Sequence, residues 1–147
     1  MAKNIAEKSC GAVVIRRRGS KSYVLIVRQL AGHWGFPKGH PKKDESEHDT
    51  AAREVAEETG VEFEFLKSFR EKTQYQLKNG NMKEVVYFMG IRTGGVEEAQ
   101  EDEISEVRWV PLSEAIILLT YDDDAVVLRK AMRYMKDNEL EDFADTL

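Results

Sequence analysis

The sequence predicts an α+β fold in which helices cover an antiparallel or mixed β-sheet. Predicted strands lie on both sides of one central helix, and two further helices follow the last strand. With 147 residues, the chain is long enough for one hydrophobic core and too short for two. We therefore expect a single domain over residues 1–147.

Two apolar runs near the N-terminus predict the first pair of strands. Residues 10–17 and 23–30 are rich in Val, Ile and Leu, and Gly19 lies at the bend between them. Cys10 is the only cysteine, so no internal disulfide can form, and we expect it to be a small buried core residue. A loop rich in Gly and Pro is expected over residues 31–43.

The central helix is predicted over residues 46–59. Four apolar residues recur at helical spacing in this stretch, and Gly60 follows as a residue that tolerates the positive φ of a helix end. Residues 61–77 and 82–93 then form a second strand pair. The Asn-Gly-Asn sequence at 79–81 between them is a strong hairpin signal.

A short strand and two helices complete the predicted fold. The strand covers residues 106–110, and Ser113 is expected to cap a helix that runs to residue 119. A final helix starts within the run of three aspartates that follows. The run is Asp122, Asp123 and Asp124, and the residues at helical intervals are Val126, Val127, Lys130, Ala131 and Tyr134.

Charge and hydropathy limit the classes of partner. The chain has 22 Lys and Arg against 27 Asp and Glu, a net charge of −5, which argues against binding to long nucleic acids. A small polyphosphate remains possible, because a local basic patch or bound metal ions can overrule the global charge. No apolar run approaches the roughly 20 residues of a membrane-spanning helix, and the N-terminus lacks the apolar stretch of a secretory signal. We expect a cytoplasmic protein with no membrane partner; its oligomeric state is left open.

Three glutamates share one face of the predicted central helix. Glu54, Glu57 and Glu58 are spaced by three and four residues, so their carboxylates project within one turn of each other. Like charges at this spacing repel, and a cluster of oxygen ligands suits Mg²⁺ or Mn²⁺. The alternative is a solvated acidic face with Arg53 and Lys43 as counterions.

The surrounding residues favour the metal-binding interpretation. Gly39, five residues, Glu45, seven residues and then Arg-Glu-Val-Ala-Glu-Glu-Thr-Gly-Val at 53–61 resemble the Nudix box at every defined position. The resemblance implies the Nudix fold, an α/β/α sandwich with a mixed sheet packed between helices. It also implies a metal-dependent hydrolase that cleaves a phosphoanhydride bond in a nucleoside diphosphate derivative.

The same resemblance implies roles for the residues of the box. Glu57 and Glu58 are expected to ligate Mg²⁺ or Mn²⁺, and the carbonyl of Gly39 to complete the metal shell. Glu54 is expected to be a ligand or the acceptor of the proton from the attacking water. Arg53 is expected to orient Glu54, while Glu45 braces the loop.

An acidic residue outside the box commonly joins the Nudix site, six residues before a Trp on the closing strand. Glu103 stands six residues before Trp109, and we expect it to activate water or ligate the metal. The alternative is a solvated loop carboxylate in an acidic region. On this basis the expected catalytic residues are Arg53, Glu54, Glu57 and Glu103.

Residues 33–40, His-Trp-Gly-Phe-Pro-Lys-Gly-His, resemble the asymmetric diadenosine tetraphosphate hydrolases within the family. This resemblance implies that His33 and Lys38 contact the phosphate chain and that Lys83 contacts another phosphate. Tyr75 is expected to hold the adenine or a phosphate, although Tyr75 or Tyr87 could instead face the core.

Three functions are compatible with these observations. The first is hydrolysis of diadenosine tetraphosphate to ATP and AMP by water. The second is another Nudix reaction on a small nucleotide, on an RNA 5′ end or on a diphosphoinositol polyphosphate. The third is a non-catalytic nucleotide-binding regulator of the same fold, for which a degenerate box would be expected; the box here is intact.

Overall fold

The two central strands of the sheet are parallel. In the computed structural model, which describes residues 5–140, Cys10 of β1 lies opposite Val86 of β6. The strand order is β3-β2-β1-β6-β5, with β4 paired to β1 and β7 to β2, and these other pairings are antiparallel. The sheet is therefore mixed, as predicted. Its strands are β1 (Ile5–Arg18), β2 (Lys21–Gln29), β3 (Trp34–Gly35), β4 (Lys38–Gly39), β5 (Val61–Gln76), β6 (Met82–Gly95) and β7 (Ile104–Pro111). The helices are α1 (Glu47–Thr59), α2 (Leu112–Leu118) and α3 (Asp122–Asp137).

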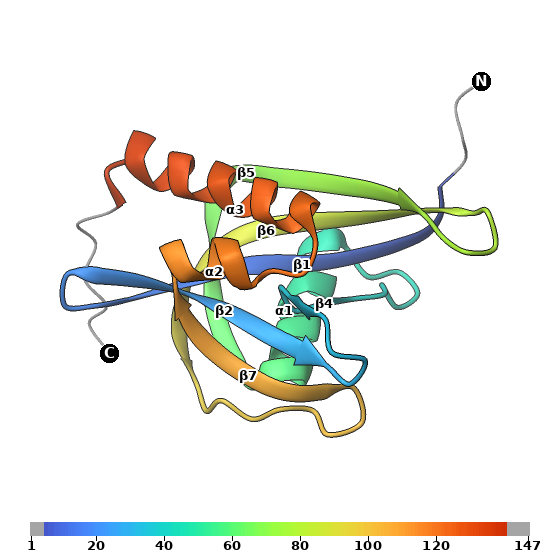
Figure 1. Ribbon diagram of the computed structural model, residues 1–147, viewed down its shortest axis with the longest axis horizontal. Helices are drawn as coiled ribbons and strands as arrows, with labels where there is room; N and C mark the ends of the chain where they lie inside the picture. Colours follow the sequence, from blue (N-terminus) through green and yellow to red (C-terminus); the bar gives the residue numbers. More distant parts are fainter. Residues whose placement is uncertain (1–4, 141–147) are drawn as a thin grey trace.

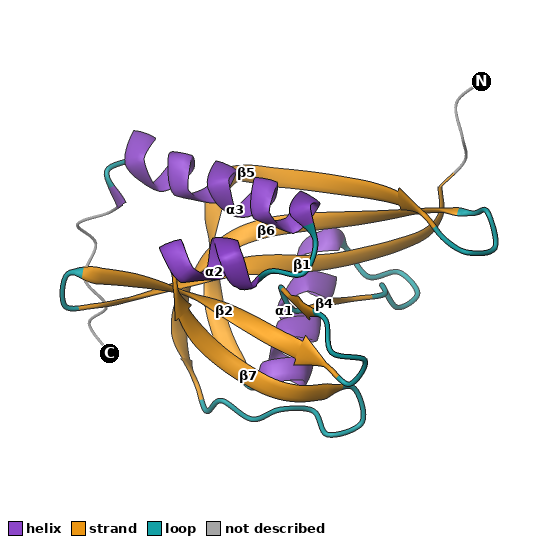
Figure 2. Cartoon of the chain, viewed as in Figure 1, coloured by secondary structure: helices purple, strands orange, loops and turns teal. Residues whose placement is uncertain are grey.

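Side chains of the central strands alternate between hydrophobic cores on the two faces of the sheet. Val13 and Ile15 pack with residues of α2 and α3, whereas Ala12 and Val14 pack with Val55 of α1 on the opposite face. Successive side chains of a strand point to opposite faces, so an unbroken apolar run produces a strand that is buried on both sides. Figures 1 and 2 show α1 on one face and α2 with α3 on the other. The predicted α/β/α sandwich is confirmed.

Both predicted hairpins and the predicted central helix are present. Gly19 takes a φ of 60° at the β1–β2 turn, and Gly80 takes a φ of 87° between β5 and β6. Helix α1 ends at Thr59, immediately before Gly60. Cys10 is fully buried, as expected.

Some local predictions were wrong. The stretch 31–43 is not wholly loop, because it contains β3 and β4. Each of these strands has only two residues, which is too short for a recognisable strand pattern in the sequence. Helix α2 begins at Leu112, so Ser113 lies inside it and Pro111 takes the N-cap position without a side-chain hydrogen bond. Proline suits this helix start, because its φ of −53° is already close to the helical value.

The final helix buries Val127 and Ala131, as its helical spacing suggested, but not Val126. Val126 is exposed, whereas Asp124 is buried in the first turn of α3.

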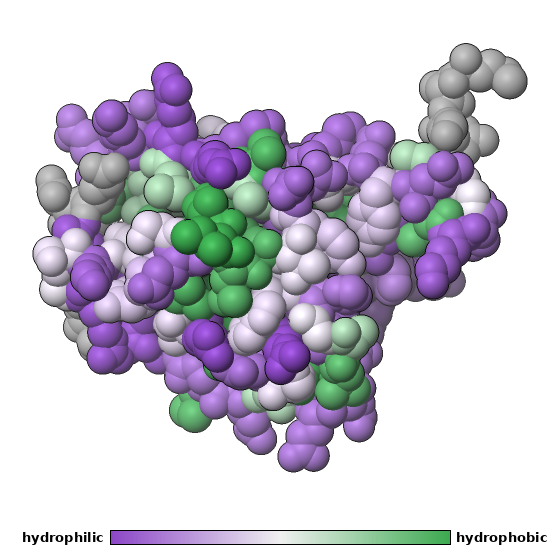
Figure 3. Space-filling view, in the orientation of Figure 1, coloured by the Kyte–Doolittle hydropathy of each residue, from purple (hydrophilic) through white to green (hydrophobic). Residues whose placement is uncertain are grey.

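Apolar residues also gather on the surface over α2, where Ile117 is 85% exposed (Figure 3). None of the helices within residues 5–140 has both the length and the apolar character of a membrane span.

Candidate active site

Helix α1 carries the glutamate cluster and is fixed at both ends. The Ser46 hydroxyl caps its start by accepting a hydrogen bond from the Asp49 amide at 3.0 Å. At its end, Gly60 takes a φ of 77° and donates its amide hydrogen to the Ala56 carbonyl at 2.8 Å. A Cβ at Gly60 would lie 2.1 Å from the carbonyl oxygen of Val96, so the next loop also requires glycine here. The glutamates are therefore presented by a firmly anchored element.

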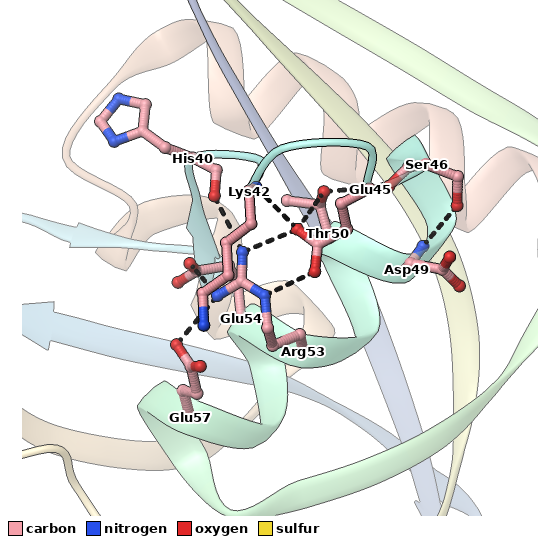
Figure 4. Close-up of polar contacts among 9 residues, drawn as sticks. All are labelled: His40, Lys42, Glu45, Ser46, Asp49, Thr50, Arg53, Glu54 and Glu57. Atoms are coloured by element: carbon pink, nitrogen blue, oxygen red, sulfur yellow. Dashed lines mark hydrogen bonds and ion pairs between the residues drawn. The ribbon is translucent and has the colours of Figure 1, made fainter.

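Arg53 is the centre of the polar network on this helix (Figure 4). Its Nε and Nη2 atoms donate to the two carboxylate oxygens of Glu45 at 2.7 and 2.8 Å. Its Nη1 donates to Glu54 at 2.7 Å and to Glu57 at 3.0 Å, and Nη2 also reaches the His40 carbonyl at 2.9 Å. The planar guanidinium can satisfy this set of acceptors at once. Arg53 thus fixes two helix glutamates and the preceding loop together.

Glu45 braces the loop that leads into α1. Its Oε1 accepts a hydrogen bond from the Lys42 amide at 3.0 Å and lies 2.7 Å from the Thr50 hydroxyl oxygen. Hydrogen bonds from Arg53, and then from Lys42 and Thr50, hold the pKa of this carboxyl well below its usual range. Glu45 therefore stays charged and keeps the loop closed against the helix.

Gly39 permits a close approach between β4 and the helix. A Cβ at this position would lie 2.1 Å from both Cδ and Oε2 of Glu54. Backbone pairing of Gly39 with Cys10 of β1 fixes the strand from the other side. The Glu54 carboxylate can therefore rest directly against the backbone only because residue 39 lacks a side chain.

Glu58 is the buried member of the cluster, with 4% of its surface exposed. Its Oε2 accepts a hydrogen bond from the Lys38 amide at 2.7 Å. Burial raises the pKa of this carboxyl to about 8, helped by the charges of Glu54 and Glu103 and opposed by the Lys38 amide. A buried carboxylate in such surroundings is stabilised by positive charge, which either a proton or a bound cation can supply.

The cluster lines a cleft of about 460 Å³ that we call the acidic cleft. It brings seven of the predicted site residues together from β4, α1, β6 and the loop before β7. They are Lys38, Gly39, Glu54, Glu57, Glu58, Lys83 and Glu103. Residues distant in the sequence therefore converge on one space that is rich in carboxylates and has lysines among its walls.

The loop that carries Glu103 is tied to the helix and to β2. The amides of Glu98 and Gln100 donate to the carbonyls of Thr59 and Glu58, at 2.8 and 3.3 Å. The Leu30 amide donates to the Glu103 carbonyl at 3.1 Å. The first two bonds use carbonyl groups at the end of α1 that have no partner within the helix. They hold Glu103 at the rim of the acidic cleft.

A second, more enclosed space of about 220 Å³ adjoins the first, and we call it the tyrosine cavity. Tyr75 and Tyr121 line it and are both partly exposed, whereas Tyr87 lies at the buried side. The other lining residues are Lys38, Thr73, Val85, Asp123 and Asp124. Lys38 therefore belongs to the walls of both spaces.

Of the predicted phosphate-binding residues, Lys38 and Lys83 lie together and His33 lies apart. Burial, and then the positive charge of Lys38, lower the pKa of Lys83. His33 lies outside the walls of both spaces, and its ring centroid is 5.4 Å from that of Tyr121. His33 is therefore a neighbour of one cavity tyrosine and not part of either wall.

The donor set of the acidic cleft suits a divalent metal ion. Carboxylates and the Gly39 carbonyl are hard oxygen ligands. Because Gly39 has no Cβ, its backbone lies directly against the Glu54 carboxylate. Within the described residues 5–140, no three or more His, Cys, Asp or Glu side chains are prearranged around one metal position. Arg53 holds Glu54 and Glu57 instead, so a metal ion would compete with its guanidinium.

Sequence reasoning missed several residues of both spaces. A small polar residue directly before the apolar run of β1 is the signal for Ser9, and an acid in the first helical turn is the signal for Asp124. Neither signal states which face the residue occupies. The missed residues of the cleft are Ser9, Gln29, Leu30, Ala31, His40, Gln100, Asp102 and Ile104, and those of the cavity include Thr73, Tyr121 and Asp124.

Comparisons with known proteins identify the family of the chain. The model of the NUDIX domain matches residues 7–133. The bis(5′-nucleosyl)-tetraphosphatase [asymmetrical] of Mus musculus is 28% identical over 143 residues, covering 89% of this chain and 97% of its own length. The 8-oxo-(d)GTP phosphatase of Mycolicibacterium smegmatis is 34% identical over 109 residues, covering 74% of this chain and 33% of its own.

Solved structures show the same architecture. A crystal structure of a C. elegans Ap4A hydrolase binary complex superposes with a TM-score of 0.82 at 25% identity, covering 90% of this chain and 99% of the other. The NUDIX domain of Shewanella oneidensis NrtR, complexed with ADP ribose, has a TM-score of 0.70 at 21% identity, covering 92% and 90%, and shares the fold. The intact box, its placement on α1 and the match over most of the sequence lead to one conclusion: the chain belongs to the NUDIX domain family and is a Nudix pyrophosphohydrolase.

Proposed function

We propose that this Nudix hydrolase cleaves dinucleoside polyphosphates, with diadenosine tetraphosphate as its preferred substrate and ATP and AMP as products. The observation that carries the proposal is the position of Lys38 in the walls of both the acidic cleft and the tyrosine cavity. A ligand that passes Lys38 can place its phosphate chain in the cleft and a nucleoside in the cavity. Relatives named bis(5′-nucleosyl)-tetraphosphatase support this substrate class.

Nudix hydrolases generally need a divalent metal, and the proposal includes Mg²⁺ or Mn²⁺ as the cofactor. The carboxylates of Glu54, Glu57 and Glu58 and the carbonyl of Gly39 would hold it, with Glu103 as a further ligand. When bound, the metal supplies positive charge against the polyphosphate and lowers the pKa of a water molecule.

The side chains of the cleft supply the remaining functions. Lys38 and Lys83 bind phosphate oxygens as point charges and hold the chain in place. The carboxylate of Glu103, or that of Glu54, accepts the proton of the attacking water. The water oxygen then bonds to phosphorus while the bond from phosphorus to the bridging oxygen breaks, and the leaving phosphate departs with that oxygen. Arg53 acts through Glu54 and Glu57, whose carboxylates it positions.

The tyrosine cavity is the proposed nucleoside subsite. Tyr75, which is 41% exposed, and Tyr121 offer ring faces to a base. Tyr87 is almost fully buried and packs edge-on against the Phe36 ring at 5.2 Å, so it is in the core as well as in the cavity wall. The choice between Tyr75 and Tyr87 as the residue that meets the base therefore favours Tyr75.

A noncanonical nucleoside triphosphate is the second candidate substrate. The 34% identity to a mycobacterial 8-oxo-(d)GTP phosphatase supports it, and the cleft and cavity could accept a mononucleotide. An RNA 5′ end is less well supported, because the Arg16, Arg17 and Arg18 cluster lies toward the β1–β2 turn, where Arg18 pairs with Lys21, and none of the three lines the cleft.

A substrate panel tests the proposal. Purified protein with Mg²⁺ or Mn²⁺ is assayed against diadenosine tetraphosphate, 8-oxo-dGTP, ADP-ribose and 5′-triphosphorylated RNA, with products resolved by ion exchange. We expect the highest kcat/KM for diadenosine tetraphosphate, with ATP and AMP in equal amounts. Two equivalents of ADP would show a different cleavage position. Inactivity on this substrate beside strong activity on another would overturn the assignment.

A further inference from the structure

The tyrosine cavity has a buried acid in its wall. Asp124 is 7% exposed and Tyr87 is 1% exposed, and both line the cavity. The Tyr87 hydroxyl donates to Oδ1 of Asp124 across 3.2 Å, joining β6 to the first turn of α3. Oδ2 lies toward Gly35 of β3, since a Cβ built on that glycine would be 3.5 Å from it. The carboxyl is thus held by a hydrogen bond from β6 and lies beside the backbone of β3.

Packing alone does not explain an acid at this position. A carboxyl taken out of water is unfavourable unless its oxygens are bonded, and an apolar residue would serve the core better. The pKa of Asp124 is raised, because burial, with the charge of Asp123, outweighs the Tyr87 hydrogen bond and the charge of Lys38. The position of Asp124 in the first turn of α3 also favours the anion through the helix dipole.

Charge is distributed unevenly around the cavity. Lys38 lies where it meets the acidic cleft, while Asp123 and Asp124 lie in the part of the wall formed by α3. A nucleotide would therefore be oriented with its phosphate toward Lys38 and its base toward α3. The edge of the base then meets the Asp124 carboxyl, which already accepts a hydrogen bond from the Tyr87 hydroxyl.

We propose that Asp124 is a specificity-determining residue, which selects a base that presents an amino group to the inner wall of the tyrosine cavity. The inference rests on the proposed function, which brings the 6-aminopurine of adenosine into this cavity. An amino group donates to the carboxyl oxygens. A 6-oxo group at the same place presents lone pairs to Oδ2, the oxygen that Tyr87 does not bond, and gives it no donor. Tyr87 supports this choice by fixing the carboxyl.

The test compares adenosine with inosine, which differ at C6 by amino against oxo and at N1, which carries a hydrogen only in inosine. We measure kcat/KM for diadenosine and diinosine tetraphosphate, and the binding of AMP and IMP by calorimetry without turnover. The variants are Asp124→Asn, which keeps the size of the side chain, and Tyr87→Phe, which leaves the acid in place. Asp122→Asn is the matched control, because it removes the same charge from the same turn and lies outside the cavity wall.

The wild-type protein should favour the adenine ligands by about 10-fold or more, as one charge-assisted hydrogen bond allows. Asp124→Asn should bring the ratio close to one, because an amide can serve either as donor or as acceptor. Tyr87→Phe should give an intermediate ratio, and Asp122→Asn the wild-type ratio. Melting temperatures report whether each variant is folded, and the ratio is independent of the amount of folded protein.

Two results would overturn the inference. One is equal binding of AMP and IMP by the wild-type protein, and the other is an undiminished preference in folded Asp124→Asn. Hydrolysis of diadenosine tetraphosphate with either result would leave the proposed function standing. Conversely, an Asp124-dependent preference for AMP in a protein that does not cleave diadenosine tetraphosphate would support the inference and remove the proposed substrate.

Discussion

At Gly39 a missing side chain sets the geometry of the acidic cleft. The Glu54 carboxylate occupies the space that a Cβ would take, at 2.1 Å. The carboxyl end of a glutamate can move, whereas the paired backbone of β4 and β1 cannot move easily. Any side chain at position 39 would therefore displace the Glu54 carboxylate and leave the fold largely unchanged.

Gly39→Ala should lower kcat at least 10-fold while the protein remains folded, since displacement of a positioned carboxylate by about 1 Å is costly in catalysis. Steady-state kinetics and thermal unfolding measure the two effects. Gly94→Ala is the control, because a Cβ there would meet its nearest neighbour, Glu62, at an ordinary 3.6 Å. Equal kinetics in the two variants would contradict the role assigned to Gly39.

Glu58→Gln should reduce turnover by about two orders of magnitude or more, because it removes the charge of a proposed metal ligand. The fold should be retained, since the burial that raises the pKa of Glu58 also favours a neutral side chain there. Single-turnover kinetics at saturating Mg²⁺ measure the effect.

The control for this variant is Glu101→Gln, an exposed acid in the loop that carries Glu103 but outside the cleft wall. It should keep the wild-type rate. A Glu58→Gln protein with near-wild-type turnover would show that Glu58 is not a metal ligand.

At the scale of elements, one ion-pair cluster docks the start of α1 onto the sheet. Glu47 pairs with Lys8 of β1 and with Arg70 of β5, whose Nη2 lies 2.8 Å from Glu47 Oε2. These cations, Arg70 first, hold the pKa of Glu47 at about 2, below its usual value of 4.5. A depressed folded-state pKa contributes stability at pH above about 4.5, and this stability is lost as the pH falls through about 2.

Arg70→Met should therefore lower the free energy of unfolding by about 1 kcal/mol at pH 7. The difference from wild type should shrink as pH falls below about 4.5 and vanish below about 2, as Glu47 is protonated. Urea unfolding at several pH values measures it. Lys72→Met, which removes a longer ion pair with Glu84 at 3.4 Å, should cost less. A loss that does not change with pH would show that packing, not charge, is responsible.

The elements that the sequence predicts well are those with local signals. Ser46 and Gly60 delimit α1, and Gly19 and Gly80 mark two turns, because each residue satisfies a backbone requirement within a few positions of itself. The box could be located for the same reason, since its spacing lies on one helix and one adjoining loop.

The tyrosine cavity could not be predicted, because its walls meet only after the sheet has formed. Tyr75 lies on β5, Tyr87 on β6 and Asp124 on α3, and no spacing in the sequence relates the three. The parallel pairing of β1 with β6 likewise depends on a long crossover. The direction in which Asp124 faces depends on how α3 packs, which its apolar pattern misjudged at Val126.

The whole molecule should remain folded when metal is removed. Arg53 already neutralises part of the acidic cluster, and among the described residues the three buried hydrophobic clusters share none with the wall of the cleft. We expect chelation to abolish turnover with little change in the circular dichroism spectrum, and Mg²⁺ or Mn²⁺ to restore it. Calorimetry should detect binding of the metal, alone or with nucleotide. If calorimetry detects no metal binding under either condition, a metal-dependent reaction is excluded.

The placement of Lys38 has a consequence for how such an enzyme can diversify. Lys38, in a two-residue strand, borders both spaces. Under the proposed function, a mutation there would alter bond cleavage and base choice in a single step. Changes on β5 or α3 reach only the tyrosine cavity among these two spaces. Substitutions that change the base preference can therefore accumulate on those elements while selection keeps the residues of the acidic cleft unchanged. The two elements can evolve quickly, whereas the cleft residues must be conserved.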